Sequence, residues 1–470
     1  MNFFVASKNI PSLHNRIMPL LGVMSFVVSV LLLLAITAMP AMGQQESELP
    51  AIDDGSSILL PRDFSAVDYY LITVDVGDKV WDNFGHTALR VVDRESNTDL
   101  VFNWGLFDAS GGSVAFASDF FRGILNYQLG VSPPSWEFNR YVAQERTVWQ
   151  DRLNLTNEQK ARLYRRLAWN LRDENIVYSY QYFFDNCTTR VRDYLNEALG
   201  GSLAQRNRAL TSSTFRDEVS DHYQSVPIVQ FGLDVLMNSR IDRRMSQWEE
   251  LFLPARLRQE LLETPSDVSE NGQRLNLLSE DALVAEFPSP QPPYNIYNRI
   301  AAALLLPLIF LMFHLRHIPM QSFSAQKGFV LSSPALTYRV LGAVTTLVSL
   351  ASGFFGLVMA IAWRESGHLD LHHNVNLLVF WPSDILGAIF GIQWLIFGRP
   401  TVLGTAMKGV VSFYIGIHVL AVLVYFVLAA TGLSEQVVAS VALYVVCPLL
   451  LLAALVSITG FKAERRIRFN

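Results

Sequence analysis

Long apolar runs divide the chain into two parts. Five runs between residues 296 and 459 each approach the ~20 residues that a helix needs to cross a bilayer. They predict helices over 296–314, 338–363, 376–397, 409–430 and 436–459. Residues 44–285 contain no such run, and a proline-rich linker follows at 286–295. We therefore expect a globular domain, a linker, a membrane domain over 296–460 and a basic tail over 461–470.

The N-terminal segment 1–43 carries an export signal. Lys8 and Arg16 precede an apolar run that ends near the small residues Ala41 and Gly43. This order is typical of a secretory signal peptide cleaved near Gly43, and an uncleaved N-terminal anchor is the alternative. Either a signal peptide or an anchor would direct the export of the domain that follows.

The charges of the predicted loops give an orientation. Lys and Arg gather in the loops after the first and third runs and in the C-terminal tail, whereas the other loops are acidic or neutral. By the positive-inside rule the tail is cytoplasmic and residues 44–285 lie outside. Five crossings from an external domain also end inside.

Shorter patterns organise the exported domain. DYYLITVDVG, HTALRVVD and LVFNWGLFD have the apolar alternation of strands, and ESNTD between the last two predicts a turn. Thr156 and Gln159 form a capping-box pattern before a helical segment. A second helix is expected to begin at Cys187 and to end before Gly200. The domain is predicted to be α+β.

Composition limits the possible partners. The chain is 51% hydrophobic, with a net charge of −5 and a mean hydropathy of +0.25. These values fit a mixed soluble and membrane protein. Without a basic stripe, nucleic acid is not an expected partner.

Cys187 is one of two cysteines and has no partner in an exported domain, where thiols normally pair. A helix start, capped by Asn186 or Asp185, would favour the nucleophilic thiolate. His86 on its strand could take the thiol proton, and Asn103 on the next strand could fix the tautomer of His86. The alternative is an inert, buried thiol.

Other residues are weaker candidates. Cys447 lies in an apolar membrane run, and we assign it no role. Tyr180 and Tyr182 could line a pocket or pack in the core, and Thr188 could only support the helix start. The first-turn amides of this helix are candidate oxyanion donors. The candidates for contacts with substrate or oxyanion are Asn186, Tyr182, Thr188, Arg190 and Arg122, the two arginines for phosphate.

One histidine-rich loop invites a metal interpretation. His368 and His372 are four residues apart, with Asp370 and His373 beside them. No HExxH motif surrounds them, and the segment lies between two predicted spans. We expect neither a metal nor a cofactor here, and we place the loop at the outer interface beneath the exported domain.

Several motifs together carry a family resemblance over residues 65–265. They are GHTALRV, VFNWGLFD, FFRGILNYQLGV, YFFDNCTTRVRDYL, FGLDVLMNSRIDR and MSQWEELFLPARL, with HHNVNLLVFWP in the membrane part. This set resembles the N-terminal periplasmic domain of the lipoprotein N-acyltransferase family Lnb. The resemblance implies a permuted papain-like (NlpC/P60-like) fold in which Cys187 is the nucleophile and His86 the base. It also implies acyl transfer from a phospholipid to an amine, such as a lipoprotein N-terminus, at the outer face of a bacterial inner membrane.

Two other function classes stay open. The NlpC/P60-like relationship also fits a cell-wall peptidase or amidase with the same Cys and His, although such an enzyme scarcely needs five membrane helices. A non-catalytic membrane scaffold would leave Cys187 merely buried. A thiol-directed probe distinguishes the scaffold from an enzyme. A catalytic Cys187 should be labelled, and the label should be lost in His86→Ala, whereas a buried thiol should not be labelled.

Overall fold

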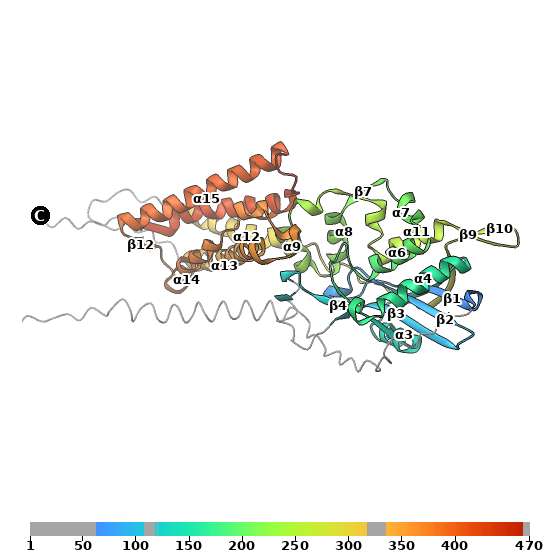
Figure 1. Cartoon of the computed structure of the whole chain (residues 1–470). Helices are drawn as coiled ribbons and strands as arrows, with labels where there is room; N and C mark the ends of the chain where they lie inside the picture. Colours follow the sequence, from blue (N-terminus) through green and yellow to red (C-terminus); the bar gives the residue numbers. More distant parts are fainter. Residues whose placement is uncertain (1–62, 108–117, 120, 317–334, 464–470) are drawn as a thin grey trace, which may run out of the picture.

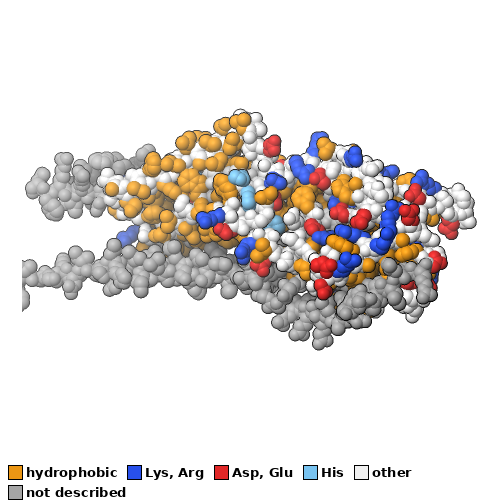
Figure 2. Space-filling view, viewed as in Figure 1, with side chains coloured by type: hydrophobic (Ala, Val, Ile, Leu, Met, Phe, Trp, Pro, Cys, Tyr) orange, Lys and Arg blue, Asp and Glu red, His pale blue; other side chains and the backbone are white. Residues whose placement is uncertain are grey.

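The computed structural model describes residues 63–107, 118–119, 121–316 and 335–463. The predicted signal segment 1–43 and most of the basic tail lie outside these residues. The molecule is elongated, with a mixed α/β domain at one end and a bundle of helices at the other (Figure 1). Hydrophobic side chains cover the bundle, and charged side chains cover the α/β domain (Figure 2).

An antiparallel sheet of seven strands forms the centre of the α/β domain, in the order β11-β5-β1-β2-β3-β4-β6. The β2–β3 hairpin has its turn at the predicted ESNTD segment, where Asn97 adopts φ 57°. The strands are β1 (Val67–Val74), β2 (His86–Asp93), β3 (Thr98–Phe107), β4 (Asn126–Ser132), β5 (Val148–Leu153), β6 (Val177–Ser179) and β11 (Leu278–Ala285).

Helices cover both faces of this sheet. Helices α4 (Asn157–Asn170) and α6 (Cys187–Ala198) bury the face that carries Tyr69 and Trp104, and α3 (Pro134–Ala143) covers the face that carries Ile72. The predicted capping box of Thr156 and Gln159 starts α4. Since β1 is buried on both faces, its residues read as an almost continuous apolar run. The predicted α+β class is confirmed.

A second core of phenylalanine and methionine side chains lies beside the start of α6 and includes residues of α8 (Phe215–His222), α9 (Pro227–Leu236) and β8 (Arg244–Ser246). Residues of α5 (Asp173–Ile176), α7 (Ser202–Arg206) and α11 (Pro254–Glu263) pack on the core of the sheet instead. The other short elements of the domain are β7 (Leu210–Thr214), α10 (Gln247–Glu250), β9 (Pro265–Glu270) and β10 (Gln273–Asn276). Helix α9 joins the two parts of the molecule, because Phe231 and Val235 belong to one core with residues of the membrane helices.

Four helices among the described residues are long and apolar enough to span a membrane. They are α12 (Ile296–Arg316), α13 (Ala335–Glu365), α15 (Thr405–Thr431) and the composite helix Ala439–Gly460, which contains α16, α17 and two π-helical segments. Pro307 lies inside α12 without ending it. These four match the predicted first, second, fourth and fifth spans.

The predicted third span, 376–397, is wrong as a continuous helix. Short 3-10 turns over Val375–Leu378 and Pro382–Leu386 precede α14 (Gly387–Phe397), with a bend of 55°. Pro382 cannot continue a preceding helix, which accounts for the break. The segment still follows α13 closely, because Gly342 and Gly356 leave no room for a Cβ against it. The count reaches five spans only if the bent pair is one span.

Hydrogen bonds tie the α/β domain to the bundle. Asn374 and Asn376 donate to the carbonyl of Val235 at 2.9 and 2.8 Å, and Asn238 donates to the carbonyls of Leu369 and His372. The 286–295 linker is also attached to the domain, since Phe287 exchanges two 2.9 Å bonds with Thr147. The domain is therefore held directly on one end of the bundle.

Candidate active site

Cys187 is the first residue of α6, as predicted, and Asn186 is its N-cap. The Asn186 side-chain oxygen accepts from the amides of Thr188 and Thr189 at 2.9 and 2.8 Å, and its nitrogen donates to the carbonyls of Tyr182 and Phe252. Asn186 therefore has a structural role at the helix start. The amides of Thr188 and Thr189 already donate to this cap. The prediction that they are free to bind an oxyanion is therefore wrong.

His86 is the first residue of β2. The residues that follow His86 and Cys187 in the chain, Thr87 and Thr188, are hydrogen-bonded to each other. The hydroxyls of Thr87 and Thr188, both fully buried, lie 3.0 Å apart. The Thr188 hydroxyl also lies 3.8 Å from the Cys187 sulfur. The strand that carries His86 is thus joined to the helix that carries Cys187 one residue beyond each candidate.

Asn103 fixes the orientation of His86. Its Oδ1 lies 2.8 Å from His86 Nε2 and also accepts from the amide of Gly105 at 2.9 Å. Its Nδ2 donates to Glu137 and Tyr141 at 3.1 and 3.2 Å. With this amide orientation, Nε2 of a neutral His86 must carry the proton and donate it. Nδ1 then keeps the lone pair.

Glu137 and Arg140 were not found from the sequence. Glu137 on α3 is 1% exposed, accepts from Ser132 at 2.9 Å and pairs with Arg140 at 2.8 Å. It lies 34 residues from Asn103 along the chain, and α3 brings it to the sheet face on which Asn103 lies. A glutamate on a helix with an arginine three residues later reads as a surface pair, so no local signal identified it.

The protonation states of the two candidates follow from their surroundings. Burial raises the pKa of the Cys187 thiol, although hydrogen bonds from the Thr87 and Thr188 backbones act in the opposite direction. Burial, with smaller contributions from the Arg140 and Arg146 charges, lowers the pKa of His86 to about 3. The resting site therefore holds a neutral thiol and a neutral imidazole.

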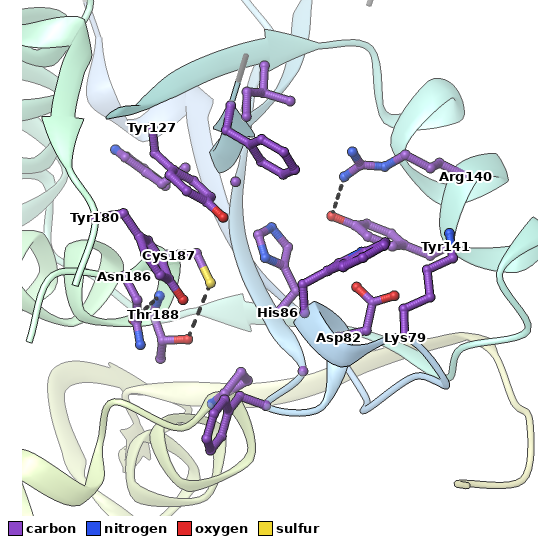
Figure 3. A pocket seen from close by; sticks show the side chains of 18 of the residues that line it. Lys79, Asp82, His86, Tyr127, Arg140, Tyr141, Tyr180, Asn186, Cys187 and Thr188 are labelled. Atoms are coloured by element: carbon purple, nitrogen blue, oxygen red, sulfur yellow. Dashed lines mark hydrogen bonds between the residues drawn. The ribbon is translucent and has the colours of Figure 1, made fainter. Parts of the chain in front are cut away.

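Both candidates line one cavity of about 1210 Å³. Figure 3 shows Cys187 with Tyr127 and Tyr180 on one side of His86, and Arg140 with Tyr141 on the other. Tyr127 and Tyr180 stack with ring centroids 4.3 Å apart. The aromatic lining continues with Trp81, Phe84, Trp104, Phe107, Trp136, Tyr182 and Phe252. The cavity thus combines an aromatic wall with a cationic one.

The remaining candidates divide by location. Tyr182 and Tyr180 line the cavity, as does Thr188. Arg122 and Arg190 do not line it. Arg190 forms a two-point ion pair with Asp185 and lies 4.2 Å from the ring centroid of Tyr178.

Arg122 has an exposed side chain, and its carbonyl accepts from Gly367 at 2.8 Å. The structure therefore brings neither predicted phosphate contact to the cavity.

The histidine-rich loop does lie against the domain, as expected. The Tyr182 hydroxyl donates to Asp370, and the rings of Tyr182 and His368 have centroids 5.0 Å apart. Ser366 donates to the carbonyl of Phe121 at 2.6 Å. No group of three or more His, Cys, Asp or Glu side chains in the described part of the chain could hold a metal.

These features define a membrane protein with a cavity-forming α/β domain held on its helices. Residues 62–220 match the family model described as the Lnb N-terminal periplasmic domain. The match covers about a third of the chain. No curated protein and no solved structure matched. The permuted papain-like fold accordingly stays a prediction.

The domain family and the apolar helices together support a multi-pass inner-membrane protein with a periplasmic domain. The basic segments that determine the orientation of the C-terminus lie largely outside the described residues. A cytoplasmic C-terminus therefore also stays a prediction.

Proposed function

We propose that the protein is a thiol acyltransferase that moves an acyl chain from a phospholipid to an amine, such as the N-terminus of a lipoprotein. Cys187 is the nucleophile and His86 the base, at the outer face of the inner membrane. The observation that carries the proposal is the 2.8 Å bond between Asn103 Oδ1 and His86 Nε2 beside a helix-start thiol. It leaves His86 Nδ1 as the basic atom in the cavity that Cys187 also lines.

The first half-reaction forms a thioester. His86 Nδ1 takes the thiol proton as Cys187 Sγ attacks the ester carbonyl of the donor, and the carbonyl electrons move to oxygen. We assign the amide of Cys187, at the first position of α6, as an oxyanion donor, aided by the positive end of the helix. The ester C–O bond then breaks, and His86 returns the proton to the lysophospholipid oxygen.

The second half-reaction reverses these roles. A neutral amine attacks the thioester carbonyl, the C–S bond breaks, and the products are an amide and the Cys187 thiol. One proton passes from the amine to the sulfur, with His86 as carrier. Because both resting groups are neutral, the site stores no ion pair, and proton transfer accompanies attack.

The position of the cavity supports lipid substrates. Tyr182 lines the cavity and donates to Asp370 in the loop that follows α13. The catalytic groups are therefore tied to the end of the membrane helices, where lipid headgroups lie. Such tethering raises the effective concentration of membrane-bound substrates. The aromatic wall offers apolar contact for an acyl chain.

The test compares the two cysteines. Cys187→Ala and Cys187→Ser should abolish transfer of a labelled acyl chain from phospholipid to a diacylglyceryl peptide, with the protein still accumulating in the membrane. Cys447→Ala is the matched control and should retain full activity. Full transfer by either Cys187 variant would disprove the proposal. Release of muropeptides from sacculi by the parent protein, without acyl transfer, would favour a wall hydrolase instead.

A further inference from the structure

The cationic wall of the cavity contains more positive charge than its own carboxylates neutralise. Lys79, Arg140 and Arg146 line the cavity, whereas Asp82 and Glu137 are the acids bonded to these arginines. Three cations against two carboxylates leave one positive charge. The excess charge is that of the exposed Lys79, and an anion in the cavity would also meet the guanidinium groups of both arginines, which bind anions through charge-assisted hydrogen bonds.

Arg146 is the buried member of this wall. Its side chain is 3% exposed, and it pairs with Asp82 at 3.1 Å and donates to the Asp75 carbonyl at 2.9 Å. Its Nη2 has no hydrogen-bond partner within the described part of the protein. An unpaired guanidinium N–H at this depth costs free energy unless an acceptor reaches it.

Arg140 is the accessible member, with a side chain 20% exposed. Its Nη2 donates to Glu137 and to the Tyr141 hydroxyl, both at 2.8 Å, and its Nε has no partner among the described residues. Figure 3 shows Arg140 above Tyr141, across His86 from Cys187. Tyr141 lies between the two arginines, 4.8 Å from Arg140 and 5.7 Å from Arg146, measured from ring centroid to Cζ.

We propose that Arg140 and Arg146, with Lys79 at the rim, form an anion subsite that binds the phosphodiester of the acyl donor. This inference rests on the proposed function and names the feature by which the donor is recognised. Guanidinium groups bind phosphate oxygens through parallel N–H bonds. These residues take the role of phosphate contact that the sequence suggested for Arg122 and Arg190, neither of which lines the cavity. The acyl ester of the same lipid then faces Cys187 and the aromatic wall.

The subsite also has a consequence for His86. The charges of Arg140 and Arg146 oppose protonation of His86. A bound phosphodiester offsets these charges and so favours the imidazolium that forms when His86 takes the thiol proton. The donor would thereby raise the pKa of His86 on binding, which a lipid without phosphate would not do.

The test measures binding to full-length Cys187→Ala protein in detergent micelles, which requires no acyl transfer. The probes are a dihexanoyl phosphatidylglycerol and the matching dihexanoylglycerol, followed by quenching of tryptophan fluorescence. Arg140→Gln should weaken phospholipid binding about tenfold or more, the range expected for a charged hydrogen bond, and leave diacylglycerol binding unchanged. Arg140→Lys should recover part of the loss. Arg243→Gln, on an exposed pair with Glu249, is the control and should bind both lipids normally.

Three results would overturn the subsite. They are unchanged phospholipid binding in Arg140→Gln, equal weakening for both lipids, and inorganic phosphate bound as tightly as the phospholipid, which would make the site one for free phosphate. Arg146→Lys, which keeps the charge beside Asp82, gives a second measurement and should also weaken the phospholipid alone. A protein that binds in this manner but never acylates its thiol would disprove the proposed function and leave the subsite standing.

Discussion

The hydroxyls of Thr87 and Thr188 lie 3.0 Å apart in the interior and join the strand of His86 to the helix of Cys187. Both residues are fully buried, so no water competes for the bond. Each is the chain neighbour of a proposed catalytic residue. We therefore expect this bond to help hold His86 near Cys187.

Thr87→Val should lower acyl transfer about fivefold, because the isosteric side chain loses one buried hydrogen bond worth roughly 1 kcal/mol. Thr87→Ser, which keeps the hydroxyl, should restore most of the rate. Rates of thioester formation in a single turnover would measure both variants. Equal rates in Thr87→Val and the parent would show that this bond does not position the pair.

Gly105 provides space for the His86 ring. A Cβ at this position would lie 2.8 Å from His86 Cε1 and 3.0 Å from Asn103 Oδ1. Gly105→Ala should displace the ring and reduce the rate by about a hundredfold, the usual effect of a misplaced catalytic group. Gly232→Ala on α9 is the control for an added methyl group, because no atom beyond its chain neighbours and its own helix backbone lies within 4 Å of the new Cβ. If both alanine variants kept full activity, the ring would have more freedom than its contacts indicate.

The pH dependence of the free protein follows from His86. Since its pKa is lowered to about 3, the imidazole stays neutral where an ordinary histidine, near 6.5, becomes charged. The value of kcat/KM for the phospholipid donor, which reports thioester formation and does not involve the amine, should therefore be flat between pH 5 and 7. An acidic limb with its midpoint near pH 6.5 would contradict a base held neutral by burial and by the two arginines.

The Tyr182–Asp370 bond connects the cavity to the membrane part. Tyr182→Phe should lower transfer from lipid vesicles about tenfold or more, the effect of one hydrogen bond to a carboxylate. Thiol labelling by a small soluble reagent should not change, because Cys187 and its cap stay in place. Tyr70→Phe on β1, outside the cavity lining, is the control. A parallel fall in labelling would mean that Tyr182 supports the thiol itself and not its attachment to the membrane loop.

Local sequence signals predicted the elements that carry Cys187 and His86, the proposed catalytic pair. Three features are properties of short segments: the Asn186 cap, the strand that begins at His86, and the hairpin that pairs Asn103 with Ala88, two residues from His86. Such segments carry their own turn and capping chemistry, which is why they can be read from one sequence.

The features that the sequence did not predict depend on which of several possible side-chain partners the fold brings together. Arg190 is bound by Asp185 and Tyr178, whereas Arg146 is placed on the cavity by its pair with Asp82, 64 residues away. The third membrane segment looked continuous because its apolar run is long enough. Asn376 in that run bonds to the α/β domain, a partner that hydropathy alone does not include.

The most direct test of the central claim is the mass of the intact protein purified in its native lipid. We predict a fraction with one added acyl chain, localised by peptide fragmentation to Cys187 and released by neutral hydroxylamine, as expected of a thioester. The adduct should be absent from Cys187→Ala and should disappear when an amine acceptor is supplied. A parent protein that stays unmodified on Cys187 after incubation with phospholipid, or an adduct that no amine removes, would contradict the account.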